Sequence, residues 1–158
     1  MIIRSLVFQD KSKILTLLQQ RGVFNNDEIK VAMGILDLYL NDPEQKDYNI
    51  FCAADNGDGL AGYICFGPIP MTEGCYDLYW IAVDQNSGRK GIGEKLLASM
   101  EEFVVKKRGR CIYLDTSSTP PYNPAKLFYK KHGFKTVSVL RDFYRVGDHK
   151  MILMKKLG

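Results

Sequence analysis

The stretch YDLYWIAVDQNSGRKGIGEKLL, residues Tyr76–Leu97, joins a strand to a helix through a basic loop that contains glycine. Apolar and aromatic residues dominate Tyr76–Val83, which is typical of a buried strand. Along Gly91–Lys107 the apolar residues recur on one helical face. The first amides of such a helix lack partners within it, so they attract an anion. Because Arg89 and Lys90 add positive charge, the loop predicts a phosphate or pyrophosphate site.

Two common nucleotide-binding motifs do not fit this loop. No Gly-Lys followed by Ser or Thr occurs at the spacing of a P-loop. The third glycine of the dinucleotide fingerprint would fall on Leu96. A tight turn before a helix would explain Gly91 and Gly93 equally well, so the loop alone leaves that alternative open.

Hydrophobic periodicity elsewhere predicts the element order β-α-α-β-β-β-α-β-α-β-β. We expect strands at residues 2–8, 48–54, 60–66, 75–83, 111–115, 134–139 and 150–157. We expect helices at residues 25–40, 91–107 and 124–132, and from a cap at Asp10 or Ser12 to about residue 20. The run Gly67-Pro68-Ile69-Pro70 should interrupt the third strand. Antiparallel hairpins that precede a β-α-β crossover indicate a mixed α/β topology.

The composition is that of a globular protein. The 158 residues suggest one domain, residues 1–158, and 46% hydrophobic with 25% charged residues exclude a disordered chain. The four cysteines (Cys52, Cys65, Cys75 and Cys111) show no metal-binding spacing, so we expect no metal. No apolar run is long enough to span a membrane and no leader pattern opens the sequence, so we expect a cytoplasmic protein without a membrane partner.

The charge is divided unevenly along the chain. The net charge is +4, yet residues 1–80 carry a balance of −5 and residues 81–158 a balance of +9. This asymmetry suggests an anionic ligand on one side and a cationic one on the other. Nucleic acid is not expected as the partner, because the basic residues form no stripe with stacking aromatics.

Two motifs together resemble the GNAT superfamily of N-acetyltransferases. The first is Gly88-Arg89-Lys90-Gly91-Ile92-Gly93, which is similar to the R/Q-x-x-G-x-G/A signature of the acetyl-CoA-binding segment. The second is NPAKLFYKKHGF at residues 123–134, similar to the family's A-x-x-L/F-Y-x-x-x-G-F helix. The chain departs from the first signature at Gly88, where the family has Arg or Gln. That change removes one side-chain contact to the cofactor and leaves the backbone contacts.

The resemblance implies the fold and the cofactor. The fold would be a single-domain α/β (α+β) arrangement, with a mixed, mostly antiparallel sheet of about seven strands flanked by about four helices. Strands 75–83 and 111–115 would splay to form the cleft for acetyl-CoA, the cosubstrate. The implied cofactor-binding residues are Ile81, Ala82, Val83, Gly88, Arg89, Lys90, Gly91, Ile92, Gly93, Glu94, Asn123 and Tyr129.

The chemistry of amine acetylation calls for a base and an acid. An alkyl amine has a pKa near 10.4, so a carboxylate, usually through water, must take its proton. Asp77 and Glu73 are the candidates, although Asp77 would also suit a solvent-facing strand end. Tyr129 matches the family tyrosine that protonates the leaving thiolate, and its alternative is a core aromatic. Asn123 would contact the pantetheine or cap its helix.

The predicted function is therefore transfer of an acetyl group from acetyl-CoA to a primary amine, by direct attack in a ternary complex. The alternatives are another acyl-CoA or acceptor, and a catalytically silent CoA-binding module. Asp27, Glu28 and Asp37, on or near the second helix, favour a cationic acceptor. The resemblance also makes a homodimer an expected assembly.

Overall fold

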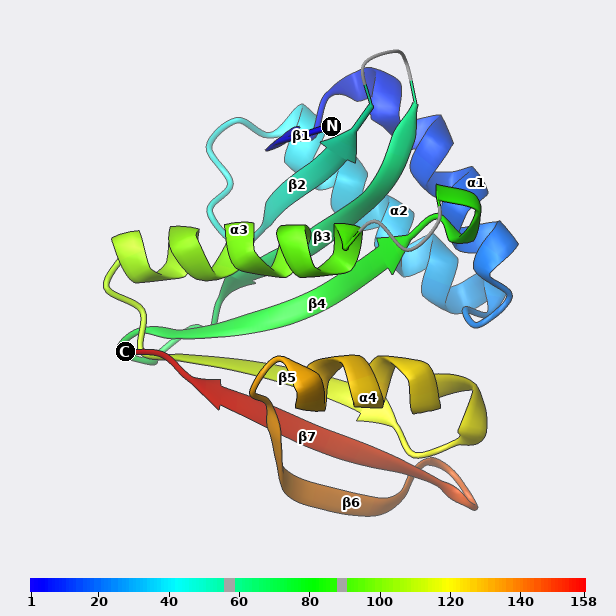
Figure 1. Cartoon of the computed structure of the whole chain (residues 1–158), viewed down its shortest axis with the longest axis vertical. Helices are drawn as coiled ribbons and strands as arrows, with labels where there is room; N and C mark the ends of the chain where they lie inside the picture. Colours follow the sequence, from blue (N-terminus) through cyan, green and yellow to red (C-terminus); the bar gives the residue numbers. More distant parts are fainter. Residues whose placement is uncertain (56–58, 88–90) are drawn as a thin grey trace.

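A seven-stranded sheet runs through the protein in the order β1-β2-β3-β4-β5-β7-β6 (Figure 1). The computed structural model describes residues 1–55, 59–87 and 91–158. The strands are β1 (Ile2–Ser5), β2 (Asn49–Ala54), β3 (Leu60–Pro68), β4 (Cys75–Val83), β5 (Cys111–Ser117), β6 (Lys135–Arg145) and β7 (Asp148–Lys156). Neighbouring strands pair antiparallel, except that β4 and β5 pair in parallel. The mixed, mostly antiparallel sheet of the prediction is confirmed.

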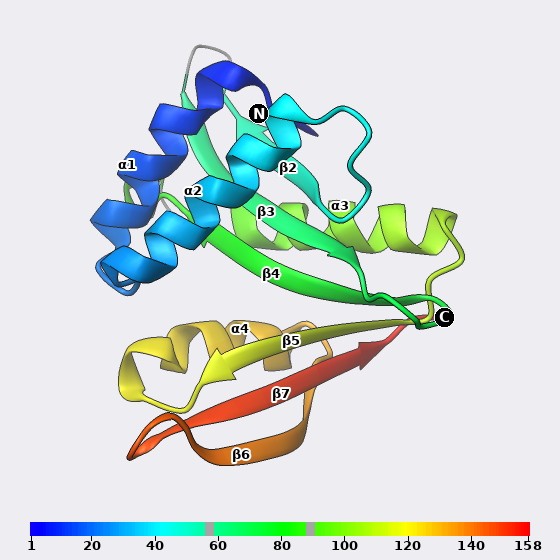
Figure 2. The same ribbon diagram turned by 180° about the vertical axis from the view of Figure 1, so that it is seen from behind.

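Four α-helices cover the sheet from two sides. Helices α1 (Lys11–Arg21) and α2 (Asn26–Asn41) pack on one face, over β2, β3 and the end of β4 (Figure 2). Helices α3 (Ile92–Lys106) and α4 (Asn123–Lys131) pack on the other face, where their apolar side chains share one core. The predicted order of helices and strands is confirmed. No helix in the described part of the chain is long and apolar enough to cross a membrane.

The sheet forks between β4 and β5. The two strands pair only at their first residues, where Cys75, Tyr76 and Asp77 face Cys111, Ile112 and Tyr113. Beyond this point β4 continues beside β3, whereas β5 continues beside β7 (Figure 1). The fork divides the sheet into two arms. We call β1–β4 with α1, α2 and α3 the N-terminal arm, and β5–β7 with α4 the C-terminal arm.

The expected interruption at Gly67-Pro68 was wrong, because β3 continues through both residues to Pro68. A Cβ on Gly67 would overlap the carbonyl oxygen of Asp47, so glycine here permits a close approach of two backbones. Pro68 is exposed at the last position of the strand, where its missing N–H is easily tolerated. The expected hairpin turn at Asn56-Gly57-Asp58 lies outside the described residues.

The predicted cap of the first helix also needs correction. Asp10 stands at the cap position of α1, but its side chain makes no capping hydrogen bond. It is buried and bound instead by the guanidinium of Arg4, at 2.6 Å and 3.0 Å, and by the amide of Val7. Two hydrogen bonds to an arginine satisfy a buried carboxylate better than one helix amide does. The Asp10–Arg4 pair thereby ties the start of α1 to β1.

Candidate active site

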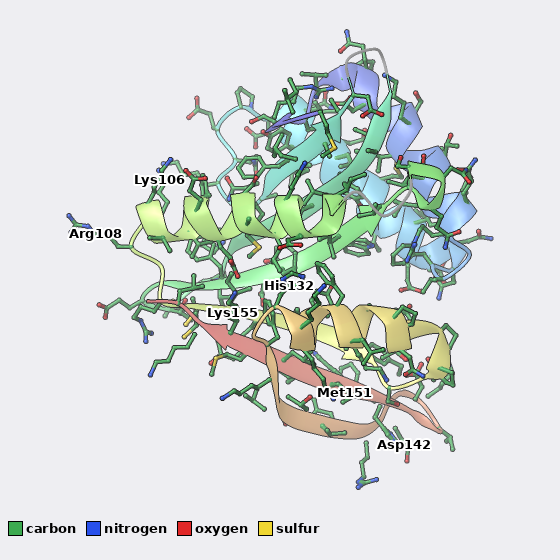
Figure 3. All side chains as sticks on the ribbon, in the orientation of Figure 1. Lys106, Arg108, His132, Asp142, Met151 and Lys155 are labelled. Carbon is green, nitrogen blue, oxygen red and sulfur yellow. The ribbon has the colours of Figure 1, made fainter. Side chains whose placement is uncertain are left out.

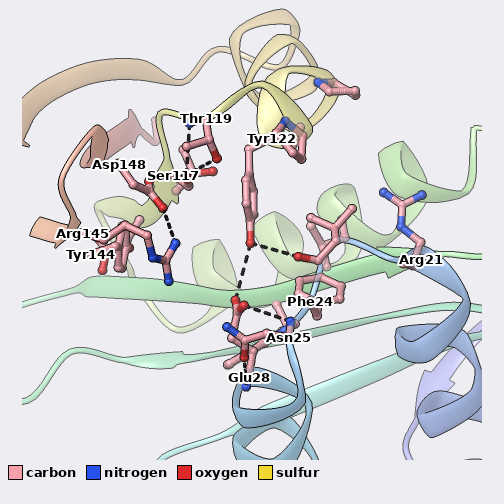
Figure 4. Close-up of a pocket in the computed structure, with 18 of the residues that line it drawn as sticks. Arg21, Phe24, Asn25, Glu28, Ser117, Thr119, Tyr122, Tyr144, Arg145 and Asp148 are labelled. Carbon is pink, nitrogen blue, oxygen red and sulfur yellow. Dashed lines mark hydrogen bonds and ion pairs between the residues drawn. The ribbon is translucent and has the colours of Figure 1, made fainter. Parts of the chain in front are cut away.

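A cavity of about 790 Å³ opens where the two arms separate. Its walls come from the α1–α2 connection, the second half of β4, the end of β5, the start of α4 and the β6–β7 turn (Figure 4). Segments far apart in the sequence therefore meet around one space. The predicted site residues can be placed relative to this cavity.

One wall is a free backbone edge of β4. Cys65 pairs with Trp80 and Phe66 with Leu78, so Tyr79 is the extra residue of a β-bulge. Beyond the bulge, the amide of Asp84 donates to the carbonyl of Ala61 at 2.8 Å.

The antiparallel ladder alternates, so the backbone groups of Ala82 also point to β3, and those of Ile81 and Val83 point to the open fork. Ile81 and Val83 therefore present free backbone groups to which an extended ligand can pair, and their contact with the cofactor stays a prediction. Ala82 contributes core packing instead, because its side chain is buried.

The start of α3 offers unpaired amides beside this edge. Gly91 adopts a left-handed conformation at the cap, with φ +67°, which suits glycine. The amide of Lys95 donates back to the carbonyl of Gly91, so the amides before it, those of Ile92, Gly93 and Glu94, precede the helical bonding pattern. A Cβ on Gly93 would lie 3.4 Å from the Phe128 ring, so α3 approaches α4 closely here. The predicted contacts at Gly88, Arg89 and Lys90 lie outside the described residues.

Tyr129 comes to the cavity from the opposite arm. It lies on α4, lines the cavity and is 9% exposed. Its ring packs edge-to-face against Phe128 and Phe134, each with ring centroids 5.6 Å away. Burial raises the pKa of its phenol, which stays protonated at neutral pH. The side chain belongs both to the core and to the cavity wall, so it is held rigidly with its proton in place.

Two carboxylates stand at the branch point of the fork. Asp77, on β4, is half-buried, and its pKa is raised by burial and then by the charge of Asp115, against a lowering effect of Lys150. Asp115, on β5, lines the cavity and lies 3.3 Å from the ammonium of Lys150. The sequence analysis named Asp77 and missed Asp115. One feature of the sequence could have indicated Asp115: it ends the strand predicted at residues 111–115, which forms the other side of the fork.

Two other predicted residues lie away from the cavity. Glu73 is exposed in the turn before β4, at the joined end of the fork, where its carbonyl accepts from Arg110. Asn123 opens α4 but borders a separate groove, with Leu127, Thr136 and Met151. Neither side chain is brought together with Tyr129 at the cavity.

The sequence analysis also missed a polar network in the β6–β7 turn. Asp148 is 5% exposed and accepts hydrogen bonds from Ser117 at 2.5 Å and from Arg145 at 2.9 Å. The hydroxyl of Ser117 in turn accepts from the amide of Thr119 at 3.1 Å. These bonds fix the end of β5 against the β6–β7 turn, and thereby position one wall of the cavity (Figure 4).

Comparison with known proteins identifies the family. Residues 46–136, more than half of the chain, match the family model for the acetyltransferase (GNAT) domain. The chain belongs to the GNAT family. It is an acyltransferase of the N-acetyltransferase type, as the resemblance implied. The family donor, acetyl-CoA, fits the free edge of β4 and the amides at the start of α3.

Individual relatives agree with this assignment. The chain is 31% identical over 113 residues to the N-alpha-acetyltransferase RimI of Mycobacterium tuberculosis. That match covers 69% of this chain and 66%, just under two thirds, of the relative. A crystal structure assigned to the GNAT acetyltransferases, from Desulfovibrio desulfuricans, has a TM-score of 0.92 and 35% identity, over 99% of both chains.

A more distant structure shares the fold. An aminoglycoside 6'-N-acetyltransferase complexed with coenzyme A has a TM-score of 0.72 at 20% identity, over 99% of this chain and 97% of that one. At this identity the likeness concerns the fold, and the acceptor of that enzyme says nothing about the acceptor of this chain.

Proposed function

We propose that residues 1–158 act as one N-acetyltransferase domain that moves the acetyl group of acetyl-CoA to a primary amine, by direct attack within a ternary complex. The fork carries this proposal. Its N-terminal arm offers free backbone groups at Ile81 and Val83 and unpaired amides at the start of α3. Its C-terminal arm presents Tyr129 to the cavity that Ile81 also lines, and the start of α3 lies beside Val83 at the edge of β4. When bound, acetyl-CoA supplies a thioester carbonyl that an amine can attack.

The N-terminal arm would hold the cosubstrate through backbone groups. The edge of β4 at Ile81 and Val83 pairs with the amides and carbonyls of the pantetheine arm. The amides of Ile92, Gly93 and Glu94 receive the pyrophosphate, favoured by the positive end of the helix dipole. Because backbone groups provide both contacts, the sequence tolerates Gly88 at the first position of the signature.

The carboxylates Asp77 and Asp115 would accept the proton of the amine. An alkyl amine is protonated at neutral pH, and it becomes a nucleophile only after a base removes that proton. Asp115 borders the cavity, and Asp77 beside it has a raised pKa, so an intervening water can pass the proton to the pair. Glu73 lies in the turn before β4, at the joined end of the fork, and has no role in our proposal.

Tyr129 would serve as the acid. As the nitrogen–carbon bond forms and the carbon–sulfur bond breaks, the leaving thiolate takes a proton from the phenol of Tyr129. The rigid packing of this ring supports the role, because a donor works best when it is held at one position. Solvent then restores the proton of the phenol.

The acceptor is proposed to be cationic, because three carboxylates surround its end of the cavity. Besides burial, Asp115, Asp148 and Glu28 each raise the pKa of Tyr144, so all three act on the same phenol. Tyr79, Tyr122 and Tyr144 line the space among them. Carboxylates and aromatic faces both favour a positively charged ligand.

An assay of thiol release with acetyl-CoA over a panel of small amines and peptide termini tests the proposal. We expect acetylation of primary amines, verified by mass, and calorimetry should detect CoA binding. If an acyl-CoA with a longer chain reacts faster than acetyl-CoA, the transferred group is another acyl group and not acetyl. CoA binding without turnover on any amine would favour the silent binding module, and no binding at millimolar CoA would overturn the proposal.

The homodimer is likewise a proposal. Strand β6 is exposed along its whole length, and it carries large apolar side chains, among them Val137, Val139 and Phe143. An exposed apolar edge strand is a common docking surface. Light scattering would measure the mass in solution, and a monomer at all concentrations would contradict the expectation.

A further inference from the structure

Glu28 presents a fixed carboxylate to the acceptor end of the cavity. It stands in the first turn of α2, where its Oε1 accepts a hydrogen bond from the amide of Asn25 at 3.1 Å. In the second hydrogen bond of the pair, the Oδ1 of Asn25 accepts from the amide of Glu28 at 2.8 Å. This capping box uses one carboxylate oxygen and orients the side chain. The other oxygen, Oε2, faces the hydroxyl of Tyr122 at 3.5 Å, across the fork (Figure 4).

The capping box explains a hydrogen-bonding side chain at this position but not its charge. A glutamine at the same position would complete the box equally well. At 3.5 Å, the contact with Tyr122 is longer than a normal hydrogen bond between oxygens. Glu28 is half-buried, and its second oxygen lacks a strong partner among the described residues.

The other two carboxylates of the cavity wall are paired with cations. Asp148 is bound by Arg145 at 2.9 Å, and Asp115 lies 3.3 Å from Lys150. Among the residues that the structure describes, no Lys, Arg or His lies within 4.0 Å of the carboxylate of Glu28. The remaining cation of the wall, Arg21, has its guanidinium turned away from Glu28 (Figure 4). Within the described chain, Glu28 is thus the cavity carboxylate without a paired cation.

We propose that Glu28 binds a second positively charged nitrogen of the acceptor, so that this protein prefers dicationic amines over monoamines. The inference rests on the proposed function. One nitrogen reacts near Asp115 on the C-terminal arm, while the other pairs with Oε2 of Glu28 on the N-terminal arm. Tyr122, whose hydroxyl faces Glu28, and Tyr144 line the same cavity, and their rings suit the carbon chain of the acceptor.

Acetylation kinetics with matched acceptors test this inference. The probes are butylamine against the series from propane-1,3-diamine to hexane-1,6-diamine, and a tripeptide with lysine as its second residue against the same peptide with norleucine. We expect a kcat/KM about tenfold or more higher for one diamine length or for the lysine peptide. A preference within the diamine series indicates a small diamine as the acceptor. A preference for the lysine peptide indicates a basic peptide terminus.

The variant Glu28→Gln isolates the charge, since it preserves the capping box. It should remove the preference through a raised KM for the dication, with a clearly smaller loss of kcat/KM for butylamine, which has no second charge to pair with Glu28. Asp27→Asn is the matched control, because it removes a charge from an exposed position in the same helical turn, and it should change neither. Equal kcat/KM for monoamines and dications in the unmodified protein, or equal losses for both in Glu28→Gln, would overturn the inference. Absence of transfer to every amine would instead refute the proposed function.

Discussion

The two arms of the forked sheet differ in how they are covered. Strand β3, in the N-terminal arm, is buried from Ala61 through Gly67, between α1 and α2 on one face and α3 on the other. In the C-terminal arm α4 packs on one face of the sheet, and β6 is exposed along its whole length. The arms join at the first residues of β4 and β5, and an ion pair of 2.5 Å between Lys155 and Glu101 also connects them. Lys155 is labelled among the side chains in Figure 3.

This difference suggests a division of labour. In our proposal the N-terminal arm supplies backbone groups at fixed positions, which suit a large invariant cosubstrate. The C-terminal arm supplies side chains, with Tyr129 and Asp115 as the proposed chemical groups. Asp77 and Glu28 are the proposed exceptions, because both bring a side chain for the acceptor from the N-terminal arm.

The largest expected effect is a loss of catalytic rate from a substitution in the C-terminal arm. Tyr129→Phe removes the proposed acid while keeping the ring that packs against Phe128 and Phe134. We expect kcat to fall by about 10²-fold or more, with the Kd of CoA unchanged. An assay of thiol release measures kcat, and calorimetry measures the Kd of CoA. Tyr113→Phe, on the same arm but outside the cavity wall, should be neutral, and unaltered turnover in Tyr129→Phe would remove the acid role.

Core truncations should separate the arms by stability. Ile64→Ala, at a fully buried position of β3, should lower the free energy of unfolding by about 2–5 kcal/mol. Val139→Ala, at a position of β6 that is 45% exposed, should lower it by less than about 1 kcal/mol. Urea denaturation measures both. Similar losses at the two positions would mean that β6 is covered in solution, for example by a second copy.

The contact between the arms at Gly93 should control cofactor affinity. In Gly93→Val the Cβ would lie 3.4 Å from the Phe128 ring, and the added methyl groups would press α4 away from α3. We expect the KM for acetyl-CoA to rise by about tenfold with a smaller change in kcat, because the amides of α3 move. Ala98→Val places the same side chain at an exposed position of α3 as control. An unchanged KM would show that this close approach does not serve the cofactor.

The smallest expected effect concerns the pH dependence at the fork. The pKa of Asp77 is raised in the folded state, so folding favours its protonated form. Its stabilising contribution is present below the ordinary pKa of an aspartate and is lost as the pH rises through the folded value. Asp77→Asn should therefore raise Tm relative to the unmodified protein at neutral pH, and not at pH 3. A Tm gain that did not depend on pH would argue against burial and the charge of Asp115 as the causes of the raised pKa of Asp77.

Sequence patterns predicted most of the fold because its elements are locally marked. The apolar face of α3 and the start of the helix predicted at residues 25–40 are short-range features, and both helices appear where expected. The fork was expected from the family resemblance, and the three-residue pairing of β4 with β5 confirms it. The extension of β3 through Gly67 could not be expected, because its cause is the backbone near Asp47, a neighbour in space only.

The site was less predictable because it depends on which side chains meet. Tyr129 was found through its motif. Asp115 was missed because one aspartate at the end of a strand looks like any other until the fork turns it toward a cavity. The contact of Tyr122 with Glu28 joins residues from opposite arms, and no spacing in the sequence encodes it. Glu73 was named for its nearness to Asp77 along the chain, yet it lies at the joined end of the fork.

The most direct test of the division of labour is a backbone amide NMR titration with CoA. We expect large shifts for Ile81, Val83, Ile92, Gly93 and Glu94, and small shifts along β6. Shifts confined to β6 and to the groove beside α4, or none at millimolar CoA, would contradict the claim that the N-terminal arm holds the cosubstrate.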